Sequence, residues 1–217
     1  MNVCDILKFA KSLSKYVVGA EGNISAKSDN GFLIKASGTR LDSLDCNDLV
    51  YCDYECSQLN NFSKKPSIEV SFHAFLMQIP GINYVGHTHP TNILKVVCSN
   101  LIEDFAHWRF FPDQVVYNGK KSCIVPYAMP GNKLTQNIKS NVENFVFDQG
   151  VFPSVILLKN HGIICCGATI KQCVIATEIC EKSAEIFLSS TLNNLNKLSQ
   201  IEIDEIDNSE MEKFRKI

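Results

Sequence analysis

The fold is decided by the segment Tyr84–Val85–Gly86–His87–Thr88–His89–Pro90, a mostly apolar run that ends in two histidines. Side chains alternate along an extended strand, so His87 and His89 point to the same face and can converge on one ion. Pro90 has no backbone N–H to donate, which favours the end of the strand at that residue. The segment therefore predicts a strand that carries half of a metal site at its rim.

Strands and helices alternate irregularly around this segment. Apolar residues spaced by three and four predict a helix over residues 3–17. Asn30–Gly31 between two β-prone runs predicts a hairpin. The further elements that we expect are strands at 49–54, 82–89, 115–117, 123–127, 155–158 and 163–166, and helices at 68–79, 91–99, 131–148 and 169–196.

The order of these elements predicts one domain. They follow no strict βαβ rhythm, and several strands pair through hairpins, which favours a mixed or mostly antiparallel sheet with helices on its faces. A chain of 217 residues with 45% hydrophobic side chains can build one large core. We expect an α/β domain over residues 1–196. An acidic, weakly periodic tail follows over 197–217, part of which we expect to be disordered.

Composition excludes several classes of function. The formal net charge is −2 and the mean hydropathy is −0.01, and no basic run alternates with aromatic residues. We therefore expect no nucleic-acid partner and no membrane binding. The longest apolar runs are far shorter than the ~20 residues of a membrane span. Asp5 stands where a signal peptide would be basic, so we expect a cytoplasmic protein.

The ten cysteines predict buried thiols rather than a disulfide framework. Cys165 and Cys166 are adjacent within an apolar run, and Cys173 and Cys180 are one heptad apart in a helical pattern. Reduced cysteine behaves as a small hydrophobic residue in such positions. A zinc site built from thiolates is the alternative, although the chain contains no Cys-x-x-Cys pair.

His161 is the natural third ligand of the predicted metal site. It lies in a tight connection between two strands, and Gly162 beside it permits a close approach of the backbones. Three protein ligands and one open position are typical of a catalytic zinc site. We expect His73 to be a surface or half-buried helix residue, and His107 lies in the poorly patterned segment 100–122.

Glu69 is the acid that we pair with this metal. It lies in the first turn of a predicted helix that leads directly into the histidine strand, and Ser67 precedes it as a helix cap. The alternative is that Glu69 is simply a favourable charge at a helix N-terminus.

A third group of residues is small and polar. Their backbone N–H groups and hydroxyls suit a phosphate, although the same residue types are ordinary in turns. This group consists of Gly22, Asn23, Ser37, Gly38 and Ser67. Lys35, Arg40 and Lys159 could add positive charge, but we expect each of them to be solvated.

Five motifs together resemble the class II aldolase/adducin family. They occur in the family's order, the resemblance runs from about residue 3 to residue 192, and the chain is similar to fuculose- and rhamnulose-phosphate aldolases. The motifs are Gly22–Asn23–Ile24–Ser25, Ala36–Ser37–Gly38–Thr39, Pro66–Ser67–Ile68–Glu69, His87–Thr88–His89–Pro90 and Lys159–Asn160–His161–Gly162.

The resemblance implies a three-layer α/β/α sandwich around a mostly antiparallel mixed sheet. It implies a homotetramer with active sites between subunits, and Zn²⁺ bound by His87, His89 and His161 with Glu69 as acid and base. It also implies that a sugar phosphate is bound through the small polar residues named above.

Two features depart from the fuculose-type pattern. Ile68 replaces a second serine before the glutamate, and no tyrosine aligns with the one that a neighbouring subunit contributes in those enzymes. The segment 108–117 is more similar to the aldolase part of bifunctional rhamnulose-phosphate aldolase/dehydrogenase proteins. Asp113 and Tyr117 are the candidates for the proton donor.

The function that we predict is zinc-dependent retro-aldol cleavage of a ketose. The expected substrate is a ketose 1-phosphate, and the expected products are an aldehyde and a dihydroxyacetone-phosphate-type compound. A sugar-phosphate dehydratase and a pentulose-phosphate 4-epimerase are the alternatives within the family. A non-catalytic assembly module of the adducin type is the alternative from another class, although a pure scaffold has no chemical reason to keep three histidines and a glutamate together.

Overall fold

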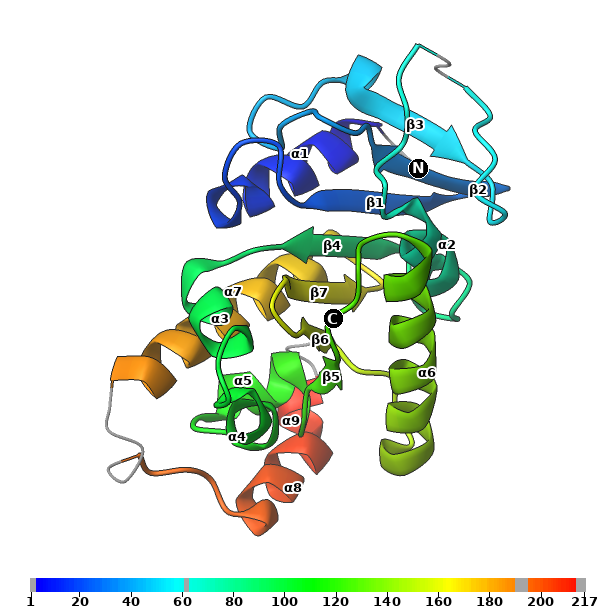
Figure 1. Cartoon of the computed structure of the whole chain (residues 1–217). Helices are drawn as coiled ribbons and strands as arrows, with labels where there is room; N and C mark the ends of the chain where they lie inside the picture. The colour runs from blue at the N-terminus through cyan, green and yellow to red at the C-terminus, as the bar shows by residue number, and fades with distance from the viewer. Residues whose placement is uncertain (1–2, 61–62, 190–194, 214–217) are drawn as a thin grey trace.

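A computed structural model of the chain describes residues 3–60, 63–189 and 195–213. Its centre is a seven-stranded sheet in the order β3-β2-β1-β4-β7-β6-β5 (Figure 1). The strands are β1 (Asn23–Ser28), β2 (Gly31–Lys35), β3 (Leu49–Cys52), β4 (Tyr84–Thr88), β5 (Cys123–Val125), β6 (Val155–Leu158) and β7 (Gly162–Gly167).

The sheet is mostly antiparallel, as the sequence predicts. Only β5 and β6 are parallel, and the other neighbouring strands run in opposite directions. The Asn30–Gly31 turn joins β1 to β2 in the predicted hairpin. The histidine strand β4 lies in the middle of the sheet, between β1 and β7. Its end is therefore where segments far apart in the sequence meet.

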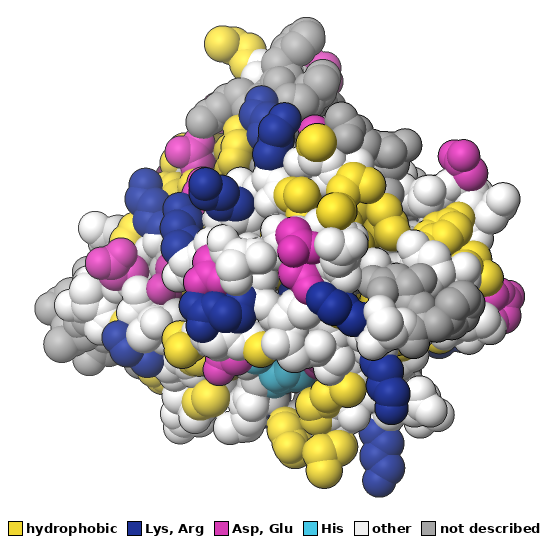
Figure 2. Space-filling model, turned by 90° about the horizontal axis from the view of Figure 1, so that it is seen from above, with side chains coloured by type: hydrophobic (Ala, Val, Ile, Leu, Met, Phe, Trp, Pro, Cys, Tyr) yellow, Lys and Arg dark blue, Asp and Glu magenta, His cyan; other side chains and the backbone are white. Residues whose placement is uncertain are grey.

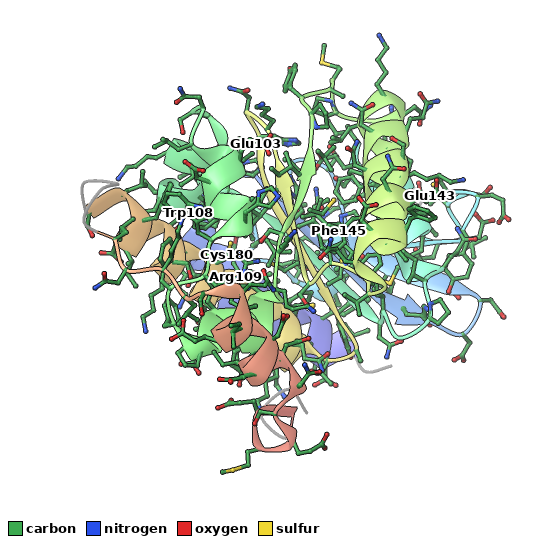
Figure 3. All side chains as sticks on the ribbon, turned by 90° about the horizontal axis from the view of Figure 1, so that it is seen from below. Glu103, Trp108, Arg109, Glu143, Phe145 and Cys180 are labelled. Carbon is green, nitrogen blue, oxygen red and sulfur yellow. The ribbon has the colours of Figure 1, made fainter. Side chains whose placement is uncertain are left out.

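Helices cover both faces, so the expected three-layer α/β/α sandwich is confirmed. Phe72 of α2 and Leu134 of α6 pack on one face, and Phe9 of α1 and Phe187 of α7 belong to two clusters on the other. Figure 3 shows the layers from below, with Glu143 and Phe145 of α6 on one side of the strands and Glu103 of α4 on the other. The helices are α1 (Val3–Leu13), α2 (Val70–Met77), α3 (Thr91–Val97), α4 (Ile102–His107), α5 (Pro112–Asn118), α6 (Asn132–Gln149), α7 (Ile170–Ser189), α8 (Gln200–Asn208) and α9 (Glu210–Lys213), with 3-10 turns η1 (Ser14–Tyr16) and η2 (Cys46–Asp48).

The segment 100–122 differs from the prediction. Residues 115–117, which we expected to form a strand, belong to the helix α5, whose first residue is Pro112. Proline at the first helical position has a suitable φ and loses no hydrogen bond. Arg109 is fully buried and holds the segment together, because its guanidinium donates to the carbonyl oxygens of Trp108 at 2.8 Å and Gly119 at 2.6 Å. Burial lowers the pKa of Arg109 to about 10.

The C-terminal part also differs from the prediction. The helix predicted over 169–196 is α7, which the structure describes as far as Ser189; residues 190–194 lie outside the described residues, and 195–199 are not helical. Helices α8 and α9 form where we expected partial disorder. The Ser199 side chain and Glu202 close a capping box at the start of α8, and Ile203 is buried. That Ser-x-x-Glu pattern is the sequence signal that predicts α8.

The surface and most of the thiols agree with the composition. All ten cysteines are free, and six of them are buried, namely Cys52, Cys123, Cys165, Cys166, Cys173 and Cys180. The prediction of buried thiols fails for the other four, since Cys4, Cys46 and Cys98 are exposed and Cys56 is half-buried. Figure 2 shows acidic and basic side chains interspersed on the face seen from above, without a large patch of one sign. None of the helices in the described part of the chain is both long and apolar enough to span a membrane.

Candidate metal centre and adjoining cavity

His87 and His89 converge at the end of β4. His87 is fully buried, and its Nδ1 donates a hydrogen bond of 2.8 Å to the carbonyl oxygen of Ile163 in β7. This bond leaves the lone pair on Nε2, which lies 3.0 Å from Nε2 of His89. The strand ends at Thr88, yet the two rings meet on one face as the His-x-His spacing predicts.

His161 joins them from the connection between β6 and β7. One potential ligand atom from each of the three histidines lies within 4.8 Å of the others. Asn160 adopts a positive φ of 56°, which asparagine tolerates better than most residues. A Cβ atom at Gly162 would lie 2.5 Å from the carbonyl oxygen of Thr88. Glycine is therefore required where this turn passes the end of β4, as the sequence predicts.

Glu69, the N-cap residue of α2, completes the cluster. Its Oε2 lies 3.4 Å from His87 Nε2, and its Oε1 lies 3.4 Å from His161 Nε2. Asn23 Nδ2 donates to Oε2 at 2.8 Å. Ser67 does not cap the helix by the usual bond to its second or third residue; its Oγ accepts from the backbone N–H of Glu69 at 3.3 Å.

Burial keeps the three imidazoles neutral. It is the largest cause that lowers the pKa of His87 to about 3 and that of His89 to about 4, and it also lowers the pKa of His161. The proximity of a second imidazole adds to each of these effects. Neutral histidine is the form that binds a metal, since a ring nitrogen must offer its lone pair.

The cluster fits a divalent metal ion. Oε1 of Glu69 is buried, and among the described residues it has no hydrogen-bond donor. A buried carboxylate oxygen in that state is costly unless a cation balances it. Three imidazole nitrogens and one carboxylate are the ligand types found in catalytic sites of zinc and related metals. His87, His89, His161 and Glu69 could hold such an ion.

A cavity of about 230 Å³ opens beside the cluster, and all five residues of the small polar group line it. The structure therefore brings Gly22, Asn23, Ser37, Gly38 and Ser67 together with Glu69, His89 and His161. Ile68 and Pro130 also line the cavity, and the Ile68 side chain is 68% exposed.

Lys35 is buried at this cavity, contrary to our expectation of a solvated side chain. It is only 2% exposed, and its Nζ donates to the carbonyl oxygens of Ala20 at 3.1 Å and Thr39 at 2.6 Å. These two bonds tie together the loops on either side of the cavity. Burial lowers the pKa of Lys35, while the negative charges of Asp48 and Glu69 oppose that shift.

His73 is also buried, although we expected a surface or half-buried position. It lies on α2, fully enclosed, and its ring bonds to Ser25 and to Asn23. The sequence carries a signal for this burial, since Phe72, Ala74 and Leu76 leave the helix without a polar face. A helix that is apolar all round is a buried one.

Asp113 and Tyr117 lie elsewhere in the chain. Both belong to α5; Asp113 faces a hollow that it shares with Phe111 and Lys182, and Tyr117 faces another that it shares with Cys166. Neither lines the cavity beside the histidines. The structure therefore does not bring the two candidate proton donors to the metal cluster of their own chain.

Known proteins share this arrangement of elements. The family model described as "Class II Aldolase and Adducin N-terminal domain" matches residues 3–188. An L-fuculose phosphate aldolase from Methanococcus maripaludis is 29% identical over 201 residues, which cover 91% of this chain and 100% of that protein. A 3-oxo-tetronate 4-phosphate decarboxylase from Escherichia coli K12 is 29% identical over 79% of this chain and 77% of its own length.

Solved structures agree with the family match. The crystal structure of YgbL from Escherichia coli superposes with a TM-score of 0.79 at 25% identity, over 93% of this chain and 95% of that one. The family model spans most of the chain, including the three histidines, the glutamate and the small polar residues. The protein therefore belongs to the class II aldolase and adducin N-terminal domain family.

Proposed function

We propose that this protein is a zinc-dependent lyase that cleaves a phosphorylated ketose by a retro-aldol reaction. The observation that carries the proposal is the continuity of two sites: the cluster of three neutral histidines and Glu69 opens directly into a cavity lined by Lys35 and small polar residues. The first site suits a metal, and the second suits the anionic end of a substrate.

His87, His89 and His161 would hold the metal, with Glu69 beside it. A divalent cation there would supply Lewis-acid chemistry, stabilising the negative charge that develops on the carbonyl and hydroxyl oxygens of the substrate. Zinc is the ion that three imidazoles suit best among the common catalytic metals that have no redox chemistry. His87 is held in the correct tautomer by its bond to the Ile163 carbonyl oxygen.

Glu69 would move a proton at the carbon next to the substrate carbonyl. In the cleavage, the C3–C4 bond breaks, its electron pair stays on the C3 fragment, and the C4 hydroxyl passes its proton to the Glu69 carboxylate as the aldehyde forms. Glu69 then returns that proton to carbon on the C3 fragment. Glu69 is buried, and its Oε1 has no hydrogen-bond donor among the described residues, so it is free to face the reacting atoms.

The anionic end of the substrate would lie against Lys35 and the polar loops. The ammonium group supplies the positive charge, while the hydroxyls of Ser37 and Ser67 supply donors. The two relatives described above support a phosphate, because their names specify an L-fuculose phosphate and a 3-oxo-tetronate 4-phosphate. Ile68 lies at the mouth of the same cavity and would restrict the shape of the sugar.

A homotetramer with a neighbouring subunit at each cavity is part of this proposal. The rim carries exposed apolar side chains, with Ile68 68% and Met129 67% exposed, next to Pro130 at the cavity wall. Asp113 and Tyr117 do not reach the cavity of their own chain, so a donor from this segment would come from a neighbour. The molar mass measured by light scattering after size-exclusion chromatography tests the assembly.

Decarboxylation of a phosphorylated keto acid is the second candidate, because the Escherichia coli decarboxylase has the same 29% identity as the aldolase, although over a smaller share of this chain. It would use the same metal and the same anionic pocket. Dehydration and 4-epimerisation of a sugar phosphate would also use the same chelation. An assembly module without activity is the alternative outside catalysis.

Product analysis separates these reactions. Zinc-loaded protein is incubated with a panel of ketose 1-phosphates, and dihydroxyacetone phosphate is detected by a coupled assay. A triose phosphate and an aldehyde support the proposal, and Glu69→Gln is expected to abolish their formation. Carbon dioxide, a dehydrated ketone or an isomeric sugar would assign the protein to one of the other reactions, and a protein that binds no zinc would support the assembly module.

A further inference from the structure

A chain of buried polar side chains runs from α2 and β1 to the metal cluster. His73 is fully buried, with Nδ1 2.6 Å from Ser25 Oγ and Nε2 in a short contact with Asn23 Oδ1. Asn23 Nδ2 lies 2.8 Å from Glu69 Oε2 and 3.0 Å from Ser67 Oγ. The mechanism described above uses Glu69 but assigns nothing to His73.

Hydrogen-bond chemistry determines the direction of every bond in this chain. A carboxylate only accepts, so the amide nitrogen of Asn23 must face Glu69 and its carbonyl oxygen must face His73. That oxygen also only accepts, so His73 must carry its proton on Nε2. Burial lowers the pKa of His73 well below its ordinary value, so the ring is neutral and Nδ1 accepts from the Ser25 hydroxyl.

The orientation of the amide decides how Glu69 is held. With the amide as described, Nδ2 anchors Oε2, and Oε1 remains directed at His161. A rotated amide would place a carbonyl oxygen against the carboxylate, and two buried acceptors would then repel each other. The carboxylate would turn away from the histidines.

We propose that His73 is a positioning residue for the metal centre: its Nε2–H group fixes the amide of Asn23, and this amide holds the Glu69 carboxylate toward His87 and His161. The catalytic consequence of this inference rests on the proposed role of Glu69 in proton transfer. The tautomer of His73 and its effect on metal affinity do not depend on which reaction the protein catalyses.

The wild-type protein provides the first test. Nitrogen-15 NMR of the zinc-loaded protein distinguishes the two tautomers of a neutral imidazole, and the His73 signals are assigned by their absence from a His73→Gln variant. We expect the proton on Nε2. A proton on Nδ1, or a doubly protonated ring at pH 7, would overturn the inference.

A set of three variants provides the second test. A glutamine amide can place its nitrogen where Nε2 lies, an asparagine amide can place its nitrogen only near Nδ1, and leucine has no donor. For H73Q we expect zinc affinity close to that of the wild type. For H73N and H73L, in which the Asn23 amide is no longer fixed against Glu69, we expect a loss of about 10–100-fold, the range typical for loss of an outer-shell partner of a metal ligand.

With a substrate that the protein turns over, kcat should be close to the wild-type value for H73Q and lower for H73N and H73L, with little change in KM. An equal loss of zinc affinity in all three variants, or no loss in H73L, would contradict the positioning role. If H73L does not fold, the tautomer of the wild-type His73 and the difference in zinc affinity between H73Q and H73N still test the positioning role. A protein with the expected tautomer and affinities that cleaves no sugar phosphate would contradict the proposed reaction alone.

Discussion

Gly162 lies directly against His89: a Cβ atom added at residue 162 would fall 2.6 Å from Cδ2 of the His89 ring and 2.5 Å from the Thr88 carbonyl oxygen. Gly162, the first residue of β7, therefore contacts His89, the second histidine of the His-x-His pair. This contact joins the β6–β7 connection to the end of β4, and it sets the separation of two of the three metal-binding candidates. Space at one backbone position thus controls the geometry of the site.

The substitution Gly162→Ala should separate the histidines. The added methyl group forces the β7 backbone away from Thr88 and His89, and we expect it to lower the free energy of unfolding by about 1–3 kcal/mol and to weaken zinc binding. Gly86→Ala is the matched control, because its methyl group would meet Leu13 on the other face of β4. Chemical denaturation and zinc titration of both variants separate the two effects; equal zinc affinity in both would contradict this account.

Removal of the metal should reduce both activity and stability. We expect dialysis against a strong chelator to abolish turnover and zinc to restore it, and a free zinc concentration 100 times the Kd to stabilise the fold by ~2.7 kcal/mol. His161→Asn should lose this stabilisation. His107→Asn should keep it, because His107 is exposed on α4, away from the cluster, and its Nδ1 bonds to the Glu103 carbonyl oxygen of its own helix. Differential scanning calorimetry with and without zinc measures the difference.

Acid should destabilise the metal-free protein. In the unfolded chain the histidines bind protons near their ordinary pKa of 6.5, whereas burial lowers the pKa of His87 to about 3 and that of His89 to about 4. The unfolded state therefore binds more protons between these values, and the free energy of unfolding falls as the pH falls below 6.5. Each such histidine contributes at most about 1.4 kcal/mol per pH unit.

Urea denaturation of the metal-free protein between pH 7 and pH 5.5 measures this slope. His87→Gln should make it shallower, because His89 and the other buried histidines still contribute, whereas His107→Asn should leave it unchanged. A free energy of unfolding that stays constant over this range would show that the buried imidazoles do not resist protonation.

Replacement of Lys35 should weaken the binding of a phosphorylated substrate. Loss of a charged hydrogen-bond donor typically costs about 1.5–3 kcal/mol, so for Lys35→Met we expect KM to rise by roughly 10- to 100-fold for a sugar phosphate, and by much less for the sugar without phosphate. Arg40→Met is the control, since Arg40 is paired with Asp42 at the surface. A similar KM change for both substrates would mean that Lys35 only holds the loops of Ala20 and Thr39 together.

Several parts of the fold could be predicted because their signals are local. The Asn30–Gly31 turn specifies the β1–β2 hairpin, and apolar periodicity specifies α1 and α6. Residues 115–117 were wrongly predicted as a strand, because Val-Val-Tyr is β-prone but Pro112 begins a helix three residues earlier. Tertiary packing against α7 and α8 decides such a short segment.

The positions of Lys35 and His73 could not be predicted for a different reason. A lysine at the end of a strand is ordinarily solvated, and its burial is tolerable here because the carbonyl groups of two separate loops, at Ala20 and Thr39, accept from it and the charges of Asp48 and Glu69 favour the ammonium form. His73 needs a hydroxyl from Ser25 and an amide from Asn23. Thr39 is close to Lys35 in the sequence, but the other partners are distant from the residue to which they bond.

The sequence by itself determined which residues can bind a metal. The His-x-His spacing places two rings on one face of a strand, and Gly162 permits the approach of His161, because alternation and steric access follow from covalent geometry alone. Only the tertiary structure decided which groups surround these histidines and Glu69: the amide of Asn23, the ring of His73 and the ammonium of Lys35. These groups meet because strand register and helix packing bring together residues that are far apart in the sequence. A local sequence pattern does not specify which distant residue forms the hydrogen bond to a buried polar atom.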